Sequence, residues 1–194
     1  MSSLIANFRS FNIVPEAELQ AIAPHIETIT LGKNEYWLRP GQTCRHLAYI
    51  QSGALRSFFT GKGGEHTYCI RFAGEVMTAY TSLITGRASE EGLQALTPCT
   101  LEILPKAVIE DNYRHSGAWQ QLGRMFAEMA YMELEARVQS FQLLTAQERY
   151  AQLMAQHPQL MLEIPLQHVA SYLGISRETL SRIRSAGMQP YRQD

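Results

Sequence analysis

The chain has 194 residues, of which 45% are hydrophobic and 18% are charged, and its 17 basic and 18 acidic residues leave a net charge of −1. This composition is typical of a soluble globular protein of one large or two small domains, and the near-neutral charge gives no bulk signal for a nucleic-acid partner. No apolar run approaches the roughly 18 residues of a membrane span, and Met1–Ser10 lacks the pattern of a signal peptide, so the expected location is the cytoplasm.

The three cysteines, Cys44, Cys69 and Cys99, are widely spaced and form no CxxC pair. An odd number without that spacing predicts neither a disulfide framework nor a zinc knuckle. His66 and Cys69 form an HxxC pair, but their odd separation on a strand would place them on opposite faces. We therefore expect reduced, partly buried thiols and no bound metal.

Glycine and proline divide roughly the first hundred residues into short segments rich in β-branched and aromatic residues. Short strands separated by frequent turn signals predict an antiparallel sandwich or barrel. The segment 54–72, ALRSFFTGKGGEHTYCIRF, indicates a hairpin whose glycines supply positive φ in the turn. In front of the barrel, VPEAELQAIAP indicates a short helix with proline at its first turn.

A long helix is predicted over 113–144, because good helix formers fill it and only Ser116-Gly117 interrupts it. Its apolar residues form two stripes, one of Trp119, Leu122, Phe126 and Met129 and the other of Leu134, Val138 and Phe141. An amphipathic helix needs one stripe to pack on its own domain. The second stripe is as compatible with a helix buried on both sides as with a seam between two copies of the chain.

After this helix, Pro158 marks a break and Pro165 lies at the start of a further helix. Residues 145–194 are therefore predicted to form a small helical unit. It is too short for a large core of its own, so we expect it to lean on the long helix.

Within this unit, residues 166–185, LQHVASYLGISRETLSRIRS, fit a helix-turn-helix. The apolar positions that would hold its two helices together are Val169, Leu173, Ile175, Leu180 and Ile183. Gly174 falls where the turn needs a residue that tolerates positive φ. Ser176 can cap the second helix, and Glu178 in its first turn is favoured by the helix dipole.

The polar residues of the second helix share the side opposite its apolar residues, since successive residues are about 100° apart. They are Arg177, Glu178, Ser181 and Arg182. Arginine can donate two hydrogen bonds to guanine, and glutamate can accept one from the cytosine amino group. This pattern favours the reading of DNA bases over a merely solvated face. The local positive charge is modest, so affinity would require two such units.

The sequence as a whole resembles the Crp/Fnr family of bacterial transcription regulators. The resemblance rests on FAGE at 72–75 in the glycine-punctuated barrel, the long helix running into TAQERY, and ISRETLSRIR. It implies an α+β fold with a cyclic-nucleotide-binding-like, antiparallel, jelly-roll-like β-roll at 1–112, a dimerisation helix at 113–144 and a helix-turn-helix domain at 145–194. Because only SAGMQPYRQD follows Arg184, we expect a short or absent wing.

The resemblance also implies a function and site residues. It implies a homodimer, not an enzyme, that binds a palindromic operator whose half-sites contain a TGA-like core, with RNA polymerase as a further partner. Carried over, it assigns Arg177, Glu178, Ser181 and Arg182 to DNA bases, and Gln167, Ser176 and Thr179 to phosphates.

The effector half departs from the cyclic-AMP-binding members of that family. Gly74-Glu75 stands where they hold the ribose, but Ser89-Glu90 stands where an Arg-Ser pair would hold the cyclic phosphate. Carboxylates beside that phosphate would repel it by about 1 to 4 kcal/mol per pair. We expect an effector pocket of Gly74, Glu75, Arg87, Ser89 and Glu90 that does not take cyclic AMP and holds an unidentified effector or none.

Two other functions are compatible with parts of the sequence. A cupin-like, small-molecule-binding or metal-dependent barrel with a helical tail would need converging histidines and carboxylates, whereas His25, His46 and His66 are scattered. A dimer whose helix-turn-helix binds protein instead of DNA would lack the steep salt dependence of operator binding.

Overall fold

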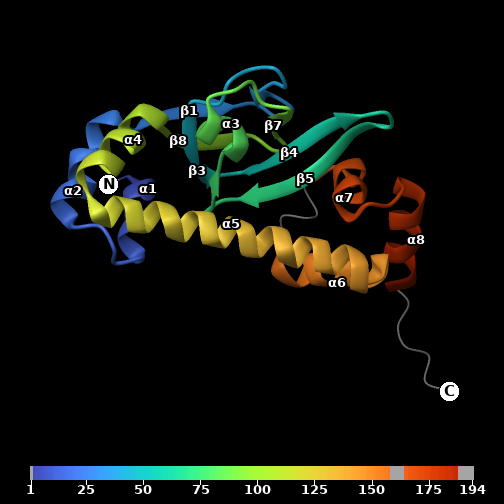
Figure 1. The fold of residues 1–194 in the computed structure, drawn as a ribbon. Coiled ribbons are helices and arrows are strands. Elements are labelled where there is room, and N and C mark those ends of the chain that lie inside the picture. The colour runs from blue at the N-terminus through green and yellow to red at the C-terminus, as the bar shows by residue number, and fades with distance from the viewer. Residues whose placement is uncertain (1, 158–163, 188–194) are drawn as a thin grey trace.

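The computed structural model describes residues 2–157 and 164–187. The β-roll lies beside the long helix α5, and the C-terminal helices gather at the far end of α5 (Figure 1). The helices are α1 (Ser3–Ser10), α2 (Glu16–Ala21), α3 (Tyr80–Thr85), α4 (Lys106–His115), α5 (Gly117–Leu143), α6 (Ala146–Gln156), α7 (Leu166–Leu173) and α8 (Arg177–Gly187), with a 3₁₀ turn η1 at Ala23–His25. None of the helices in these ranges is long and apolar enough to cross a membrane.

The roll consists of two four-stranded antiparallel sheets, ordered β1-β8-β3-β6 and β2-β7-β4-β5. The strands are β1 (Glu27–Leu31), β2 (Tyr36–Leu38), β3 (His46–Ser52), β4 (Ala54–Gly61), β5 (Gly64–Phe72), β6 (Val76–Met77), β7 (Glu91–Ala95) and β8 (Cys99–Pro105). Their inner faces enclose an apolar core that includes Ile50, Leu55 and Leu93. The predicted α+β class, the antiparallel roll and the hairpin over 54–72 are confirmed.

One prediction about the hairpin is wrong. His66 pairs with Phe59, and Cys69 pairs with Ser57, because a β-bulge shifts the register between them. Since Phe59 and Ser57 are two residues apart on β4, their partners share one face of the hairpin. On a regular strand, side chains three residues apart point to opposite faces. The extra residue in β5 shifts the alternation by one position, so that His66 and Cys69 share a face. Even so, the described residues contain no group of three or more potential metal ligands.

Helix α1, for which the sequence analysis made no prediction, is held by a buried carboxylate. Glu102 of β8 is 4% exposed and accepts hydrogen bonds from the Leu4 amide at 2.6 Å and the Ser2 hydroxyl at 2.7 Å. Gln51 donates a third bond to Glu102 at 2.7 Å. A carboxylate at the first turn of a helix is favoured by the helix dipole and by the free amides there.

The long helix begins later than the predicted residue 113. Ser116 has an extended backbone (φ −136°, ψ 120°) and caps α5, which leaves Tyr113 on α4. Most of the first apolar stripe faces the chain's own domain, since Trp119 and Leu122 are each 2% exposed and pack against Phe8 of α1, and Phe126 lies beside them. Its last member, Met129, is 39% exposed. The second stripe is exposed, with Leu134 at 47% and Val138 at 46%.

The C-terminal helices α7 and α8 pack against the roll as well as against α5. Residues Ala54, Ile70 and Phe72 of β4 and β5 share an apolar core with Val169, Leu173 and Leu180 of α7 and α8. The Ser171 hydroxyl of α7 accepts a hydrogen bond from the Thr67 amide at 2.8 Å and donates one to the Glu65 carbonyl at 3.3 Å. Because β5 is an edge strand, α7 covers backbone groups that would otherwise be unpaired.

Candidate nucleic-acid interface and effector pocket

The turn between α7 and α8 has the geometry that Gly174 was predicted to supply. Its φ of 69° and ψ of 33° are left-handed, and it ends α7. The Ile175 amide donates to the Ala170 carbonyl at 3.0 Å, and the Gly174 amide donates to the Ser171 carbonyl at 3.1 Å. This helix end satisfies carbonyls that α7 would otherwise leave free. A Cβ atom at Gly174 would lie 2.6 Å from Phe141 Cε1, so close packing also requires glycine here.

Helix α8 begins with the predicted cap. The Thr179 amide donates to the Ser176 hydroxyl at 3.1 Å. Hydrogen bonds from the backbone amide of Glu178 and from Ser176 hold the pKa of the Glu178 carboxyl below its usual value. An ionised carboxylate in the first turn is stabilised by the helix dipole.

The four predicted base-contacting residues are together on one exposed face of α8. Arg177, Glu178, Ser181 and Arg182 are all exposed, whereas Leu180 on the other side is 0% exposed. Arg182 donates to the Thr179 hydroxyl at 3.2 Å, a bond that a base or phosphate acceptor could replace. The roles of these residues toward DNA stay predictions.

The three predicted phosphate contacts differ in their surroundings. Gln167 is exposed on α7, with its amide 3.3 Å from His168 Nε2. Ser176 and Thr179 lie at the start of α8, with their hydroxyls 3.1 Å apart. Serine and threonine at a helix N-terminus sit beside free amides, which is where phosphates bind to proteins. The segment after residue 187, where a short or absent wing was expected, lies outside the described residues.

Two arginines connect the helix-turn-helix formed by α7 and α8 to helices α5 and α6. Neither was predicted from the sequence. Arg137 of α5 donates to the Tyr172 carbonyl at 2.9 Å, and Arg149 of α6 donates to the Leu173 carbonyl at 3.1 Å. Their guanidinium groups lie 4.9 Å and 4.8 Å from the centre of the Phe141 ring. Cations at the C-terminal carbonyls of α7 are favoured by its dipole. In the sequence, the only sign of these contacts is that both positions are arginine.

The predicted effector-pocket residues differ in how far the chain itself engages them. Gly74 is in the left-handed region, with φ 95°, and Glu75 accepts hydrogen bonds from the Phe72 amide at 2.7 Å and from Arg71 at 3.3 Å. Arg71 also binds Glu133 of α5. Both oxygens of Glu75 are therefore engaged by the chain itself, on the side of the roll that faces α5.

The second half of the predicted pocket is also engaged. Ser89 is 5% exposed, and its hydroxyl donates to the Glu91 carbonyl at 2.9 Å, whereas Arg87 and Glu90 are exposed. Glu91, which sequence reasoning did not place in the pocket, is 9% exposed and bound by Ser57. Burial raises the pKa of Glu91 against the opposing effect of that hydrogen bond.

Two of the cysteines are shielded from solvent, and burial disfavours the ionised form of the third. Cys44 and Cys99 are each 3% exposed, and burial raises the pKa of the Cys69 thiol to about 11. A thiol that stays protonated is a poor nucleophile and metal ligand.

The fold is shared with solved bacterial regulators. A protein from Eubacterium rectale assigned to the Crp/Fnr family of transcriptional regulators matches at a TM-score of 0.75 and 17% identity, over 93% of this chain and 87% of that one. FixK2 from Bradyrhizobium japonicum matches at a TM-score of 0.71 and 18% identity, over 87% and 89% of the two chains.

A third match is the c-di-GMP-responsive regulator CLP from Xanthomonas campestris, with a TM-score of 0.67 and 18% identity over 92% of this chain and 96% of that one. No family model matches the sequence, and no curated protein matches it. The two sheets, the long helix and the helix-turn-helix thus give this chain the fold of the Crp/Fnr transcription regulators.

Proposed function

We propose that this protein is a transcription regulator that binds a palindromic DNA operator as a homodimer. The observation that carries the proposal is the exposed polar face of α8, behind which Leu180 is buried and Gly174 makes the turn. An arginine-rich face on a capped helix after such a turn is the arrangement that enters the major groove. The fold shared with Crp/Fnr regulators supports the same proposal.

The exposed stripe of α5 supports the homodimer. Its members follow an alternating spacing of four and three residues, which is the repeat of a coiled-coil seam. They are the half-buried Ala127 and the exposed Tyr131, Leu134, Val138 and Phe141. Tyr131 is 65% exposed and Phe141 is 41% exposed. A row of large apolar side chains exposed to solvent is unusual for a helix that has no partner. A parallel pair of α5 helices would carry two copies of α8 at one end of the dimer.

Cyclic AMP is not the effector in this proposal. Glu75 is held by Arg71 and the Phe72 amide, and Ser89 is held by the backbone of Glu91. A cyclic phosphate would have to displace these bonds beside the carboxylate of Glu90. Any effector is a different molecule, and titration calorimetry with cyclic AMP should give no binding heat.

The test is an operator selection from random DNA, followed by binding measurements with Arg182→Ala. A symmetric site should emerge, and the variant should bind it about 10- to 100-fold more weakly. Arg114→Ala removes the same charge from exposed α4 and serves as the control. Selection that returns no palindrome, or equal affinity of Arg182→Ala and wild type, would contradict the proposal.

The same measurements separate the alternatives. Direct DNA binding requires an affinity that falls steeply with salt, whereas a helix-turn-helix that binds protein does not. No observation favours a metal-dependent barrel, because the described part of the chain holds no cluster of metal ligands. Contact with RNA polymerase is part of the proposed role, and transcription in vitro from the selected site would test it.

A further inference from the structure

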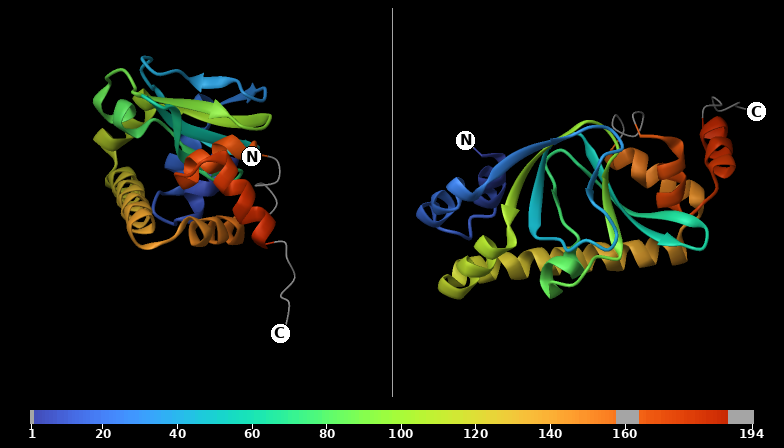
Figure 2. Two further views of the ribbon diagram at one scale, coloured as in Figure 1. Left: turned by 90° about the vertical axis from the view of Figure 1, so that its right-hand side faces the viewer. Right: turned by 90° about the horizontal axis from the view of Figure 1, so that it is seen from above.

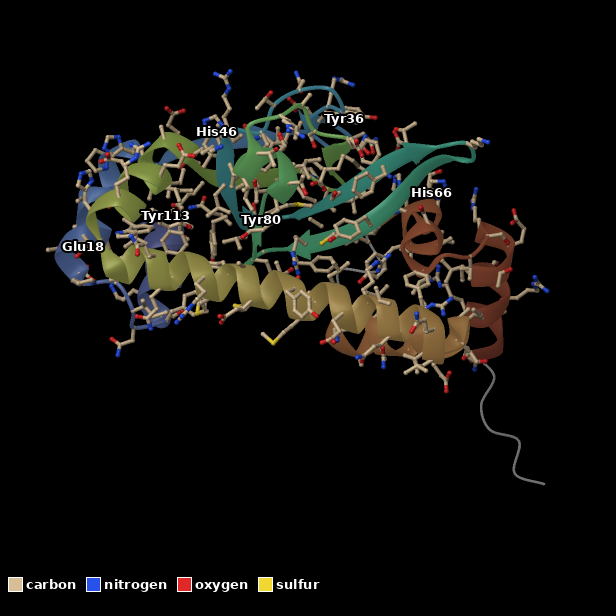
Figure 3. The ribbon with its side chains drawn as sticks, in the orientation of Figure 1. Glu18, Tyr36, His46, His66, Tyr80 and Tyr113 are labelled. Atoms are coloured by element: carbon tan, nitrogen blue, oxygen red, sulfur yellow. The ribbon has the colours of Figure 1, made fainter. Side chains whose placement is uncertain are left out.

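A small pocket is formed on the roll by β2, the loop after it and the first residue of β3. Its volume is about 240 Å³. Figure 3 labels His46, which lines the pocket, and Tyr36, the neighbour of Trp37, on the side of the roll away from α5. The blue strands of this region and α5 are also on opposite sides in the left view of Figure 2. The pocket therefore lies apart from the exposed stripe of α5.

One wall of this pocket is apolar and comes from β2. Trp37 is half-buried, and Leu38 is 7% exposed. An indole ring offers a flat apolar surface against which another aromatic ring can pack. Pockets for drug-sized ligands have volumes of roughly 300 to 1,000 Å³, so this smaller one suits a small molecule with a single ring.

The other wall offers hydrogen-bond donors. Gln42 Oε1 accepts from the Arg39 amide at 2.8 Å, which leaves the NH₂ group of the Gln42 side chain to donate. The Thr43 hydroxyl and the Arg45 guanidinium make no hydrogen bond or ion pair within residues 2–157 and 164–187. Amide NH₂ and guanidinium groups can only donate hydrogen bonds. A ligand group that accepts several bonds and carries negative charge complements this wall.

The positive charge of the pocket comes from Arg45 alone among its lining residues. Burial, and after it the charge of Arg45, lower the pKa of His46 against the opposing charge of Glu27. His46 is therefore neutral at pH 7, since its ordinary pKa is about 6.5. Glu27 does not line the pocket. A carboxylate can accept two parallel hydrogen bonds from one guanidinium group, which makes it the anion that Arg45 pairs with best.

The loop that carries these donors is held in place by hydrogen bonds of its backbone. The Gly41 amide donates to the Ser89 carbonyl at 2.7 Å, and the Ser89 amide donates to the Gln42 carbonyl at 2.8 Å. The Cys44 amide donates to the Ser82 hydroxyl at 2.9 Å. A ligand that enters a preformed pocket loses less free energy to the ordering of the protein.

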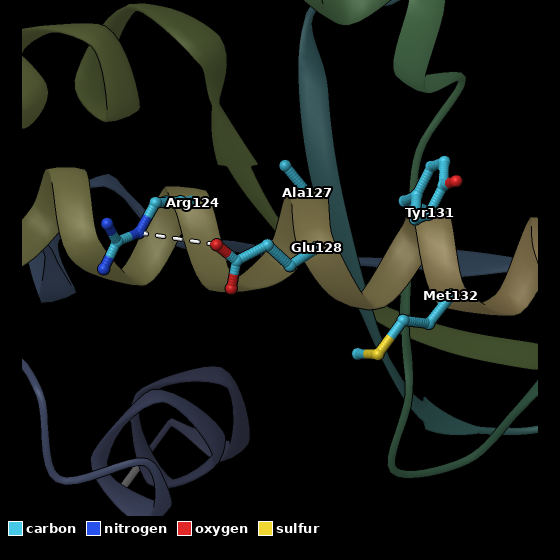
Figure 4. A pocket seen from close by; sticks show the side chains of 5 residues that line it. All are labelled: Arg124, Ala127, Glu128, Tyr131 and Met132. Atoms are coloured by element: carbon cyan, nitrogen blue, oxygen red, sulfur yellow. Dashed lines mark ion pairs between the residues drawn. The ribbon is translucent and has the colours of Figure 1, made fainter.

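The larger hollow on α5 lacks the free cation. Its volume is about 480 Å³, and its arginine, Arg124, forms an ion pair with Glu128 at 3.6 Å (Figure 4). The charge of Arg124 is thus already matched. Tyr131, which also lines this hollow, belongs to the exposed stripe of α5 that the proposed homodimer would cover. Size alone does not make a ligand site, and the pocket beside Trp37 has the better chemistry.

We propose that this pocket binds a small aromatic carboxylate. The carboxylate pairs with Arg45 and accepts from Gln42 or Thr43, and the ring lies against Trp37. This ligand site is separate from the candidate effector pocket of Gly74, Glu75, Arg87, Ser89 and Glu90. It does not depend on DNA binding, so its test leaves the proposed function standing whatever the result.

The test is a titration of the full chain with benzoate, followed by tryptophan fluorescence. The chain has two tryptophans, and Trp119 is 2% exposed, so a change on adding ligand reports Trp37. Trp37→Phe should abolish the change and confirms the reporter. Benzamide has the same shape without the charge. Arg39→Ala removes an exposed arginine next to the pocket but not in its lining, and is the matched control for Arg45→Ala.

We expect benzoate to change the fluorescence of the wild type along a saturable curve. Arg45→Ala should bind benzoate about 10- to 100-fold more weakly, because a hydrogen-bonded charge is lost, and benzamide should bind the wild type correspondingly weakly. Arg39→Ala should bind benzoate as the wild type does. Since Arg45 and Arg39 are both exposed, circular dichroism should show both variants folded.

Three results would overturn the proposal. A fluorescence change that never saturates would mean that benzoate only collides with Trp37. Equal binding of benzamide and benzoate would mean that the pocket does not recognise the negative charge. Equal losses in Arg39→Ala and Arg45→Ala would mean that the surface charge of this region attracts benzoate without a site at Arg45.

Discussion

The two candidate sites, the exposed face of α8 and the effector pocket, differ in how many of their polar side chains are hydrogen-bonded within the chain. On α8, Arg177 and Ser181 are exposed, and Arg177 makes no hydrogen bond or ion pair with the residues that the structure describes. In the candidate effector pocket, Glu75 is bound by Arg71 and by the Phe72 amide. The Arg177 side chain is thus available to a partner molecule, whereas the carboxylate of Glu75 is already bound by the chain itself.

This difference separates two kinds of consequence. Substitutions on the exposed face of α8 should lower DNA affinity and leave the free energy of unfolding unchanged. Substitutions of Glu75 or Ser89 should lower stability, because the chain itself binds these side chains, and should not create binding of cyclic AMP. Substitutions behind α8 should do both, since they misplace the face that binds.

The largest effect is expected for Gly174→Ala, which acts behind the α8 face. The residue has φ +69°, and an added Cβ would lie 2.6 Å from the Phe141 ring. Left-handed strain and overpacking together should cost about 2 to 4 kcal/mol in the free energy of unfolding, and the operator affinity should fall with it. Chemical denaturation and operator titration measure the two quantities.

Gly117→Ala is the matched control for that experiment. This glycine opens α5, and a Cβ there meets nothing within 4 Å. Alanine in a helix should be neutral or slightly stabilising. Equal stability of the two variants would show that neither the backbone at Gly174 nor its contact with Phe141 constrains the turn.

Arg177→Ala should change affinity alone. A side chain that donates to a base edge contributes about 1 to 3 kcal/mol, so the operator affinity should fall by roughly 10- to 100-fold at constant salt. The melting temperature should stay that of the wild type, because the side chain is exposed and forms none of the hydrogen bonds or ion pairs found among the described residues. A large loss of stability would mean that α8 uses this arginine internally, and the contrast with the pocket would fail.

His168, on the inner side of the helix-turn-helix, predicts a dependence of stability on pH. Burial, followed by the positive charge of Arg56, lowers the pKa of His168 to about 4. The unfolded chain, with a histidine pKa of about 6.5, therefore takes up the proton first as the pH falls. Stability from this group is complete above about pH 6.5 and is lost progressively toward pH 4, by about 1 kcal/mol over the first pH unit.

Thermal melts across that range, with His168→Gln beside the wild type, measure this loss. The variant should be less sensitive to pH over the window by about that amount. His25→Gln, at an exposed position before β1, is the control and should follow the wild type. An identical pH dependence of His168→Gln and the wild type would show that His168 is accessible in the folded protein.

How much could be predicted from the sequence follows from the range of the contacts involved. The turn at Gly174, the cap at Ser176 and the hairpin over 54–72 depend on residues close together in the chain, and these predictions are confirmed. The hydrogen bonds between Glu102 and the start of α1 join residues that are 98 to 100 positions apart in the chain. Such a contact leaves no periodic pattern in the sequence.

The contacts of Glu75 in the candidate effector pocket could not be predicted for the same reason, and the pocket itself stays a prediction. Comparison with the cyclic-AMP-binding members showed that Ser89-Glu90 stands where their Arg-Ser pair would be, but not which contacts Glu75 makes within the chain. Arg71 binds Glu133, which lies 62 residues away on another element. The bulge in β5 is a further example, because one inserted residue changes which side chains share a face without altering the composition of the strand.

The smallest effect, and the most direct test of the contrast between the sites, is expected for Glu75→Gln. The side chain is 34% exposed and lies 3.3 Å from the Arg71 guanidinium, so losing its charge should cost only a few tenths of a kcal/mol to about 1 kcal/mol of stability. Asp111→Asn, which removes a carboxylate 3.9 Å from Arg114 at the surface, controls for a generic ion pair. Because the amide oxygen of the glutamine still accepts from the Phe72 backbone amide, the turn at 72–75 should keep its fold. Calorimetry with cyclic AMP should give no heat for either variant or for the wild type. The contrast would be contradicted if the wild type bound cyclic AMP and Glu75→Gln did not. That result would mean that the ligand displaces Arg71 from Glu75, and that Glu75, like the exposed residues of α8, binds a partner molecule.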